Sequence, residues 1–194
     1  MRRVLVQLAL VAATRAALAQ DSTATPHLPA GLTVPARILH YARSAAKDFG
    51  SPEGGVAYQY GDSVTRLTVY LYARDSTWRG RPAREALQQE VQLFKQALEI
   101  ERTRGAYEAY QIAFDEPDSI PLVTAGSAFA PGRQVAVALR RQRTIYVSLY
   151  YVYAIGNAFV KVRGTVPQAR WQQTDIPLFA REFARQASGG APRP

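Results

Sequence analysis

Cysteine is absent from the 194-residue chain, and histidine, methionine and lysine are scarce. The missing thiols exclude disulfides and a cysteine nucleophile, and a zinc site would need ligands that the chain does not have. His27 falls in a polar segment and His40 on the polar side of a predicted helix, so neither is expected to act as a general base. No GxSxG elbow and no glycine-rich phosphate loop is present. The sequence therefore predicts no metal and no cofactor and favours a non-enzymatic protein.

Acidic residues are also few: 15 Asp and Glu stand against 24 Lys and Arg, a net charge of +9. The charge falls to +6 without residues 1–19, because these contain three Arg and no acid. A moderately basic surface suits anionic lipid or envelope polysaccharide, and the charge does not point to a nucleic-acid site.

A long apolar run occurs only near the N-terminus, at Val4–Ala13. Two arginines precede it, and small residues at 17–19 form a cleavage site. Arg15 interrupts the run well short of the ~20 residues that span a bilayer, which argues against a retained anchor. We therefore expect residues 1–19 to be a removed signal peptide, and the mature chain to be periplasmic or extracellular without a transmembrane helix.

Composition divides the mature chain into a disordered tether over residues 20–34, one folded domain over 35–187 and a disordered tail over 188–194. Apolar periodicity and turn residues predict the elements of that domain. They are a helix over 35–49, a hairpin over 58–74, a long helix over 82–104, strands near 106–115, 121–130, 133–141, 143–153 and 158–165, and a helix over 175–187.

This pattern predicts an α+β fold, in which an antiparallel sheet of about six or seven strands has the long helix and the C-terminal helix packed on one face. Turns are expected at Pro131–Gly132, at Gly156–Asn157 and at a hairpin tip over 140–143. The arginines of that tip suit either a bound oxyanion or, as we favour, a solvated tip.

An acidic cluster at Asp115, Glu116 and Asp118 surrounds Pro117. It is interpreted as a turn between strands, because Asp and Pro favour turn geometry. The alternatives are a weak calcium loop, whose usual residue order is missing, or a pair of catalytic acids.

Side-chain alternation is the most informative pattern in the predicted sheet. With Leu67, Val69 and Leu71 turned to the core, the residues between them face the other way, and the same rule applies to the later strands. The outward set contains large aromatic and basic side chains, so it could be covered by the N-terminal segment, covered by a partner, or bind a ligand by stacking. Tyrosine pairs across strands also stabilise a sheet by themselves. The candidate binding residues are Tyr70, Tyr72, Tyr146, Tyr150, Lys161 and Arg163.

The segments GGVAYQY (54–60), LTVYLY (67–72) and FVKVR (159–163), with the long helix between the last two, resemble a family of uncharacterised exported bacterial proteins. That family has no established activity, so the resemblance implies no catalytic residue. The order of strand, helix and strand is also similar to PsbP-like domains, which implies an assembly or binding accessory.

Three functions follow from these patterns. The first is an exported, non-enzymatic envelope domain whose Tyr and Arg face contacts a protein, a glycan or a lipid headgroup. The second is a hydrolase that uses carboxylates such as Asp115 and Asp118 on an envelope substrate, which requires both acids within about 10 Å of each other. The third is a purely structural assembly accessory.

Overall fold

The fold is described from a computed structural model, which covers residues 27–62, 65–74, 81–122 and 129–189. Eight strands, one 3-10 helix and two α-helices are present in these ranges. In chain order they are β1 (Arg37–Ile38), β2 (Tyr41–Asp48), β3 (Val56–Gly61), β4 (Arg66–Ala73), α1 (Ala83–Thr103), β5 (Ala109–Pro121), β6 (Phe129–Arg141), β7 (Thr144–Ile155), β8 (Ala158–Pro167), η3 (Gln168–Gln173) and α2 (Ile176–Ala187).

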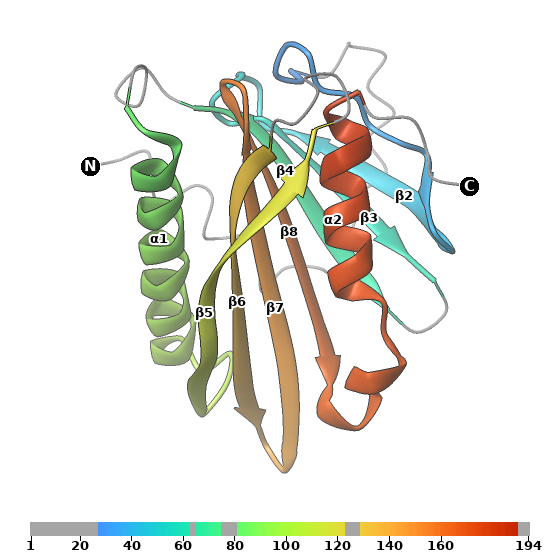
Figure 1. Ribbon diagram of the computed structural model, residues 1–194. Helices are drawn as coiled ribbons and strands as arrows, with labels where there is room; N and C mark the ends of the chain where they lie inside the picture. The colour runs from blue at the N-terminus through green and yellow to red at the C-terminus, as the bar shows by residue number, and fades with distance from the viewer. Residues whose placement is uncertain (1–26, 63–64, 75–80, 123–128, 190–194) are drawn as a thin grey trace.

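All eight strands belong to one antiparallel sheet in the order β1-β2-β3-β4-β8-β7-β6-β5 (Figure 1). Strands β1–β4 and strands β5–β8 each form a meander of neighbouring strands, and α1 connects the two meanders. The sheet is continuous because β4 pairs with β8, for example through Val69 opposite Val162. This pairing places residues from the two halves of the chain side by side.

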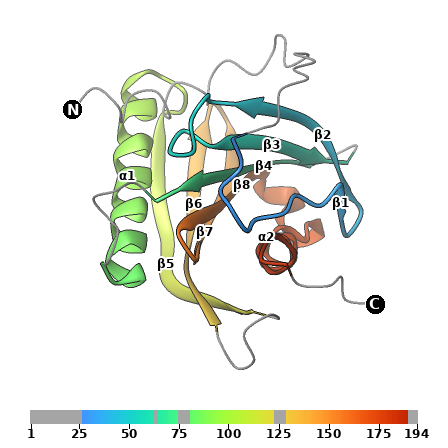
Figure 2. The ribbon, with the colours of Figure 1, turned by 90° about the horizontal axis from the view of Figure 1, so that it is seen from above.

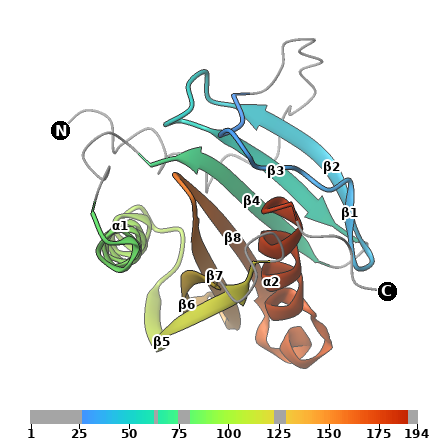
Figure 3. The same ribbon diagram turned by 45° about the horizontal axis from the view of Figure 1, so that its top comes forward.

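The two helices pack on opposite faces of the sheet (Figure 2). Helix α1 lies beside β5 and β6 on one face, which we call the α1 face. Helix α2 lies on the other, the α2 face, where it contacts β1 and β5 at the two sheet edges as well as β7 and β8 between them. The strongly twisted sheet thus curls around α2 (Figure 3).

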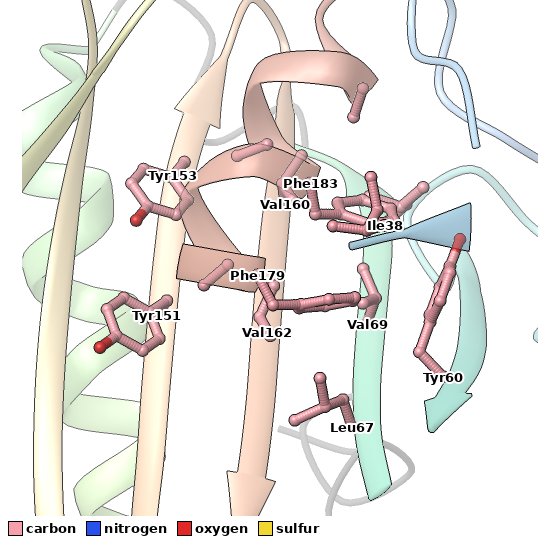
Figure 4. Packing of buried hydrophobic residues seen from close by; sticks show 14 of the residues in the cluster. Ile38, Tyr60, Leu67, Val69, Tyr151, Tyr153, Val160, Val162, Phe179 and Phe183 are labelled. Atoms are coloured by element: carbon pink, nitrogen blue, oxygen red, sulfur yellow. The ribbon is translucent and has the colours of Figure 1, made fainter. Parts of the chain in front are cut away.

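The core of the α2 face is built around two phenylalanines of α2 (Figure 4). Phe179 and Phe183 are both fully buried, and the Phe179 ring meets Tyr41 and Tyr60 edge-on with centroids 5.3 Å away in each case. Aliphatic residues of β4 and β8 complete this layer. They are Leu67, Val69, Leu71, Val160 and Val162, all fully buried.

The α+β class, the antiparallel sheet, the long helix and the C-terminal helix agree with the sequence prediction. The sheet has eight strands where about six or seven were expected. The two helices also cover opposite faces where one helix-covered face was expected. Apolar stripes show that a helix packs on a sheet, but they do not show on which face.

The helix predicted over residues 35–49 is wrong, because these residues form β1, a turn and β2. Leu39 in the turn has a positive φ of 52°, and the following strand pairs with β3. Ile38 and Tyr41 are three residues apart, a helical spacing, yet both reach the core because the turn reverses the chain between them. Pairing with β3 overrides the helix preference of the alanines in β2.

Two predicted turns are also absent. Residues 109–121 form one continuous strand, β5, so the acidic cluster lies within a strand. Pro131 and Gly132 lie inside β6, and the rest of the strand predicted at 121–130 falls partly outside the described residues. A Cβ at Gly132 would come within 2.4 Å of the Tyr153 ring, so this glycine provides space for an aromatic side chain.

The described part of the predicted tether, residues 27–34, packs against the domain. Leu32 is buried, and the Thr33 amide donates a hydrogen bond to the Ala187 carbonyl over 3.0 Å. The ordered chain therefore begins before residue 35. The predicted signal peptide at 1–19 lies outside the described residues. Within the ranges given above, no helix combines the length and the apolar character that a bilayer span requires.

Candidate binding face beside helix α1

All six candidate residues lie on the α1 face, as the alternation predicts. Strand register places Tyr70 opposite Lys161 and Tyr150 opposite Arg163, so side chains from three neighbouring strands share one surface. Tyr72 and Tyr146 belong to the same face, where both pack with residues of the α1 core. The period of two along each strand fixes this grouping.

Helix α1 covers part of this surface, and the expectation that the whole face is free of helix is wrong. Tyr72 is 6% exposed and Tyr150 is 2% exposed, because α1 packs over them. The reason is that valines on β6 and β7 share this face and provide an apolar strip for the stripe of α1. The strip consists of Val135, Val137 and Val152.

Beneath α1, Lys161 forms a partly buried ion pair with Glu90 of the helix. Its Nζ lies 3.0 Å from Glu90 Oε2, and the side chains are 17% and 13% exposed. The Tyr72 hydroxyl donates to the same Oε2 over 2.5 Å, and Lys161 Nζ lies 4.8 Å from the centroid of the Tyr72 ring. Burial, and next the charge of Glu90, raise the pKa of Tyr72 well above its usual value. These contacts make Tyr72 and Lys161 parts of the helix–sheet junction.

Tyr150 is held in the same junction by stacking. Its ring lies parallel to that of Phe94 on α1, with centroids 4.2 Å apart and an interplanar angle of 13°. Its hydroxyl donates to the Glu90 carbonyl over 3.4 Å. Burial raises the pKa of this hydroxyl well above the usual value. Tyr150 therefore stabilises the packing of α1 and offers no ring face to a ligand.

The remaining candidates are partly accessible. Tyr70, Tyr146 and Arg163 are each half-buried. The Arg163 guanidinium carbon lies 5.7 Å from the centroid of the Phe94 ring, on the side of α1 that faces the sheet. Among the described residues, Arg163 has no carboxylate and no hydrogen-bond partner. Burial raises the pKa of Tyr70, while the charge of Arg163 opposes that shift, as expected for near neighbours.

Helix α1 reaches Tyr72 of β4 and Lys161 of β8, but no described helix lies above the part of this face formed by β2, β3 and the first half of β4 (Figure 3). Register places Lys47 in one row with Tyr70, with Ala57 of β3 between them, and Gln59 in one row with Arg163, with Thr68 of β4 between them. The Gln59 amide donates to the Thr68 hydroxyl over 3.0 Å. We call this surface the open half. Its residues are Lys47, Gln59, Arg66, Thr68, Tyr70 and Arg163, all half-buried or exposed.

Sequence reasoning missed four of these residues and the helix residues Glu90 and Phe94. Applying the same alternation to Arg66, Thr68 and the strand partners on β2 and β3 finds the four, because paired residues share a face. Glu90 lies three residues after Leu87 on the edge of the apolar stripe of α1, which is the only signal in the sequence for its inward position.

The acidic cluster does not form an acid pair. Asp115 faces α1, where its Oδ2 lies 2.7 Å from Lys95 Nζ and its Oδ1 pairs with Arg133. Asp118 faces α2, where it accepts from the Tyr153 hydroxyl over 2.7 Å and from Arg181. The two carboxylates lie on opposite sides of the sheet, so they cannot act on one bond. The interpretation of this cluster as a turn is equally wrong.

The hairpin tip over residues 140–143 is present between β6 and β7. Its arginines are exposed, and Arg140 pairs with Glu108 over 3.2 Å. His40 is exposed as well, with its Nε2 3.2 Å from Asp62 Oδ2. Over the described part of the chain, no group of three or more His, Cys, Asp or Glu side chains is placed to hold a metal.

The sequence matches no family model, and no curated protein matches it. The resemblance to a family of exported bacterial proteins thus has no support from a family model. Among solved structures, the solution structure of cyanobacterial PsbP (CyanoP) from Synechocystis sp. PCC 6803 is similar, with 12% identity over 72% of this chain and 77% of that chain. Its TM-score of 0.43 marks a weak likeness of fold, which gives no basis for transferring a function.

Proposed function

We propose that the protein is an exported, non-enzymatic binding domain that contacts an envelope partner through the open half of the α1 face. Export is included because of the predicted signal peptide at residues 1–19. The main support for this binding site is the environment of Arg163. Its side chain is half-buried near Tyr70 and has no carboxylate or hydrogen-bond partner among the described residues. A partly desolvated guanidinium gains most from an acceptor on another molecule.

The positions of Asp115 and Asp118 favour binding over catalysis. The hydrolase alternative needs Asp115 and Asp118 in one cleft, and they occupy opposite faces. An assembly accessory is compatible with the same surface, since a stable complex with another envelope protein would also use it. Tyr70 suits a binding surface in either case, because its ring supplies apolar contact area and its hydroxyl can hydrogen bond to water or to a partner.

The test compares variants of the mature chain in retaining a component from an envelope extract. Tyr70→Ser and Arg163→Ser are expected to lose that component while the melting temperature changes little. Arg141→Ser is the matched control, because Arg141 is an exposed arginine at the β6–β7 tip. Equal retention by all three variants would contradict the proposed surface. A large fall in melting temperature for Tyr70→Ser would show that the ring is structural.

A further inference from the structure

The two parts of the α1 face differ in charge balance. Under α1, each basic side chain of the sheet has an acid beside it: Lys161 pairs with Glu90, and Arg133 with Asp115. On the open half, Lys47, Arg66 and Arg163 come from three different strands, and none of them pairs with a carboxylate among the described residues. The open half is therefore a surface of unpaired positive charge, while the basic side chains beneath α1 are paired with carboxylates.

Neutral hydrogen-bonding groups lie between these three charges. Gln59, Thr68 and Arg163 stand directly opposite one another on β3, β4 and β8. Tyr70 is the next residue along β4 on the same face. Such an array of donors around basic side chains suits ligands that present several oxygen acceptors.

The spacing of the two arginines indicates how those acceptors are arranged. Arg163 pairs with Thr68, so Arg66, two residues before Thr68, is the diagonal neighbour of Arg163. Diagonal neighbours in an antiparallel sheet are about 7 to 8 Å apart. An extended peptide rises about 3.3 Å per residue, so carboxylates at alternate positions repeat at about 6.6 Å on one side of the chain.

We propose that the open half binds an extended segment of a partner protein with acidic side chains at alternate positions. This inference rests on the proposed function and specifies its partner. One carboxylate of the segment reaches Arg163 beside α1, and the carboxylate two residues further along the segment reaches Arg66. Thr68 hydrogen bonds to the segment between these contacts, and Gln59 and Tyr70, the neighbours of Thr68 on the same face, hydrogen bond to it beside them.

The position of α1 favours a peptide over a membrane surface. An α-helix with its side chains is about 10 to 12 Å wide, and α1 rises from the same face on which Arg163 lies. Arg163 touches Phe94 of that helix, so a planar layer of headgroups would meet α1 before it reached the guanidinium. A single extended chain can lie beside the helix and reach Arg163, Tyr70 and Arg66 together.

Fluorescence anisotropy of a labelled peptide with alternating Glu and Thr tests the proposal on the mature chain at low salt. Binding is expected to weaken about tenfold for Arg66→Gln and for Arg163→Gln, the loss of one charge-assisted hydrogen bond each. Arg141→Gln, a matched change in an exposed turn, is expected to leave it unchanged. Arg66 is exposed and its variant is expected to keep the fold, so the test remains decisive if Arg163→Gln is unstable.

Two further probes separate the alternatives. A peptide with the same composition but its Glu residues in one block is expected to bind more weakly, and equal binding would overturn the extended geometry. If the protein bound anionic phospholipid vesicles more strongly than the peptide, and if Arg66→Gln weakened that binding, the partner would be a membrane surface and the peptide proposal would be wrong. If neither peptide binds but Tyr70→Ser still loses the envelope component, the proposal of an acidic segment is wrong and the proposed binding function stands. If neither effect is seen, both are wrong.

Discussion

Lys161 illustrates how much the position of one residue in a strand determines. The period of two along β8 assigns it to the face of Tyr70 and Tyr150, and the structure places it there. Its surroundings depend on α1, which brings Glu90 to within 3.0 Å of its Nζ. The same alternation therefore gives two kinds of residue on one face: Lys161 in a helix–sheet junction and Arg163 at the edge of that junction.

Lys161→Met is expected to lower the free energy of unfolding by about 2 kcal/mol. The change leaves the carboxylate of Glu90, which is 13% exposed, without its cation. Removing one partner of a fully buried pair costs about 3 to 5 kcal/mol, and partial exposure reduces that cost. Urea unfolding measures the difference. Adding Glu90→Gln removes the unpaired charge, so the double variant is expected to be more stable than Lys161→Met alone. A Lys161→Met protein as stable as the native chain would contradict this account of the pair.

At the scale of elements, α2 is the central packing unit of its face. The sheet curls so that both edge strands, β1 and β5, contact this one helix. The Asp118 carboxylate strengthens the contact at the β5 edge, because it accepts from Tyr153 of the sheet and from Arg181 of the helix. We therefore expect the stability of α2 to depend on its buried side and to change little with substitutions on its outer side.

Two neighbouring residues of α2 test this dependence. Phe179→Ala is expected to lower the free energy of unfolding by about 3 to 5 kcal/mol, because Phe179 is fully buried among aromatic rings. Leu178→Ala is expected to change it by less than about 0.5 kcal/mol, because Leu178 is 54% exposed. Denaturant midpoints of the two variants measure the contrast. Similar losses would mean that α2 does not pack as described.

The elements differ in how well the sequence predicts them, for physical reasons. The long helix and the C-terminal helix have wide apolar stripes, and a helix is the secondary structure that brings residues with this spacing onto one face. The residues around Tyr41 and Ala45 also fit a helix, and only pairing with β3, more than ten residues away, makes them a strand. Similarly, Pro117 indicates a turn, but β5 is an edge strand, where a residue without an amide proton is tolerated.

At the scale of the molecule, one helix packs on each face of the sheet, and tyrosines are buried beneath both helices. Tyr60 and Tyr153 pack toward α2, and Tyr72 and Tyr150 toward α1. Which tyrosines share a face follows from alternation. Their burial follows from the pairing of β4 with β8 and from the paths of α1 and α2 across the two faces of the sheet, which no local pattern specifies. The open half remains because α1 packs over β5–β7 and does not extend over β2 and β3.

This burial predicts that the protein loses stability in alkali. Burial raises the pKa of Tyr107 and of Tyr151 to about 12, whereas tyrosines of the unfolded chain ionise near 10. Between pH 10 and 12 the unfolded state therefore binds fewer protons than the native state, so the free energy of unfolding falls as the pH rises. The contribution is fully present below pH 10, and each group can remove up to about 2 kcal/mol across that window, because solvent screening weakens the effect for hydroxyls that are not completely buried.

Urea unfolding at pH 8, 10 and 11, with absorbance at 295 nm to follow phenolate formation, measures this loss. The other buried tyrosines act in the same direction, and side chains other than tyrosine contribute little, because the chain has no cysteine and three lysines. Tyr151→Phe removes one raised pKa, so its stability is expected to fall less steeply with pH than that of the native chain. If all the tyrosines ionised near pH 10 while the protein stayed folded, the rings would have to be in contact with water. Helix α1 would then lie farther from the sheet than the stacked pair of Phe94 and Tyr150 requires.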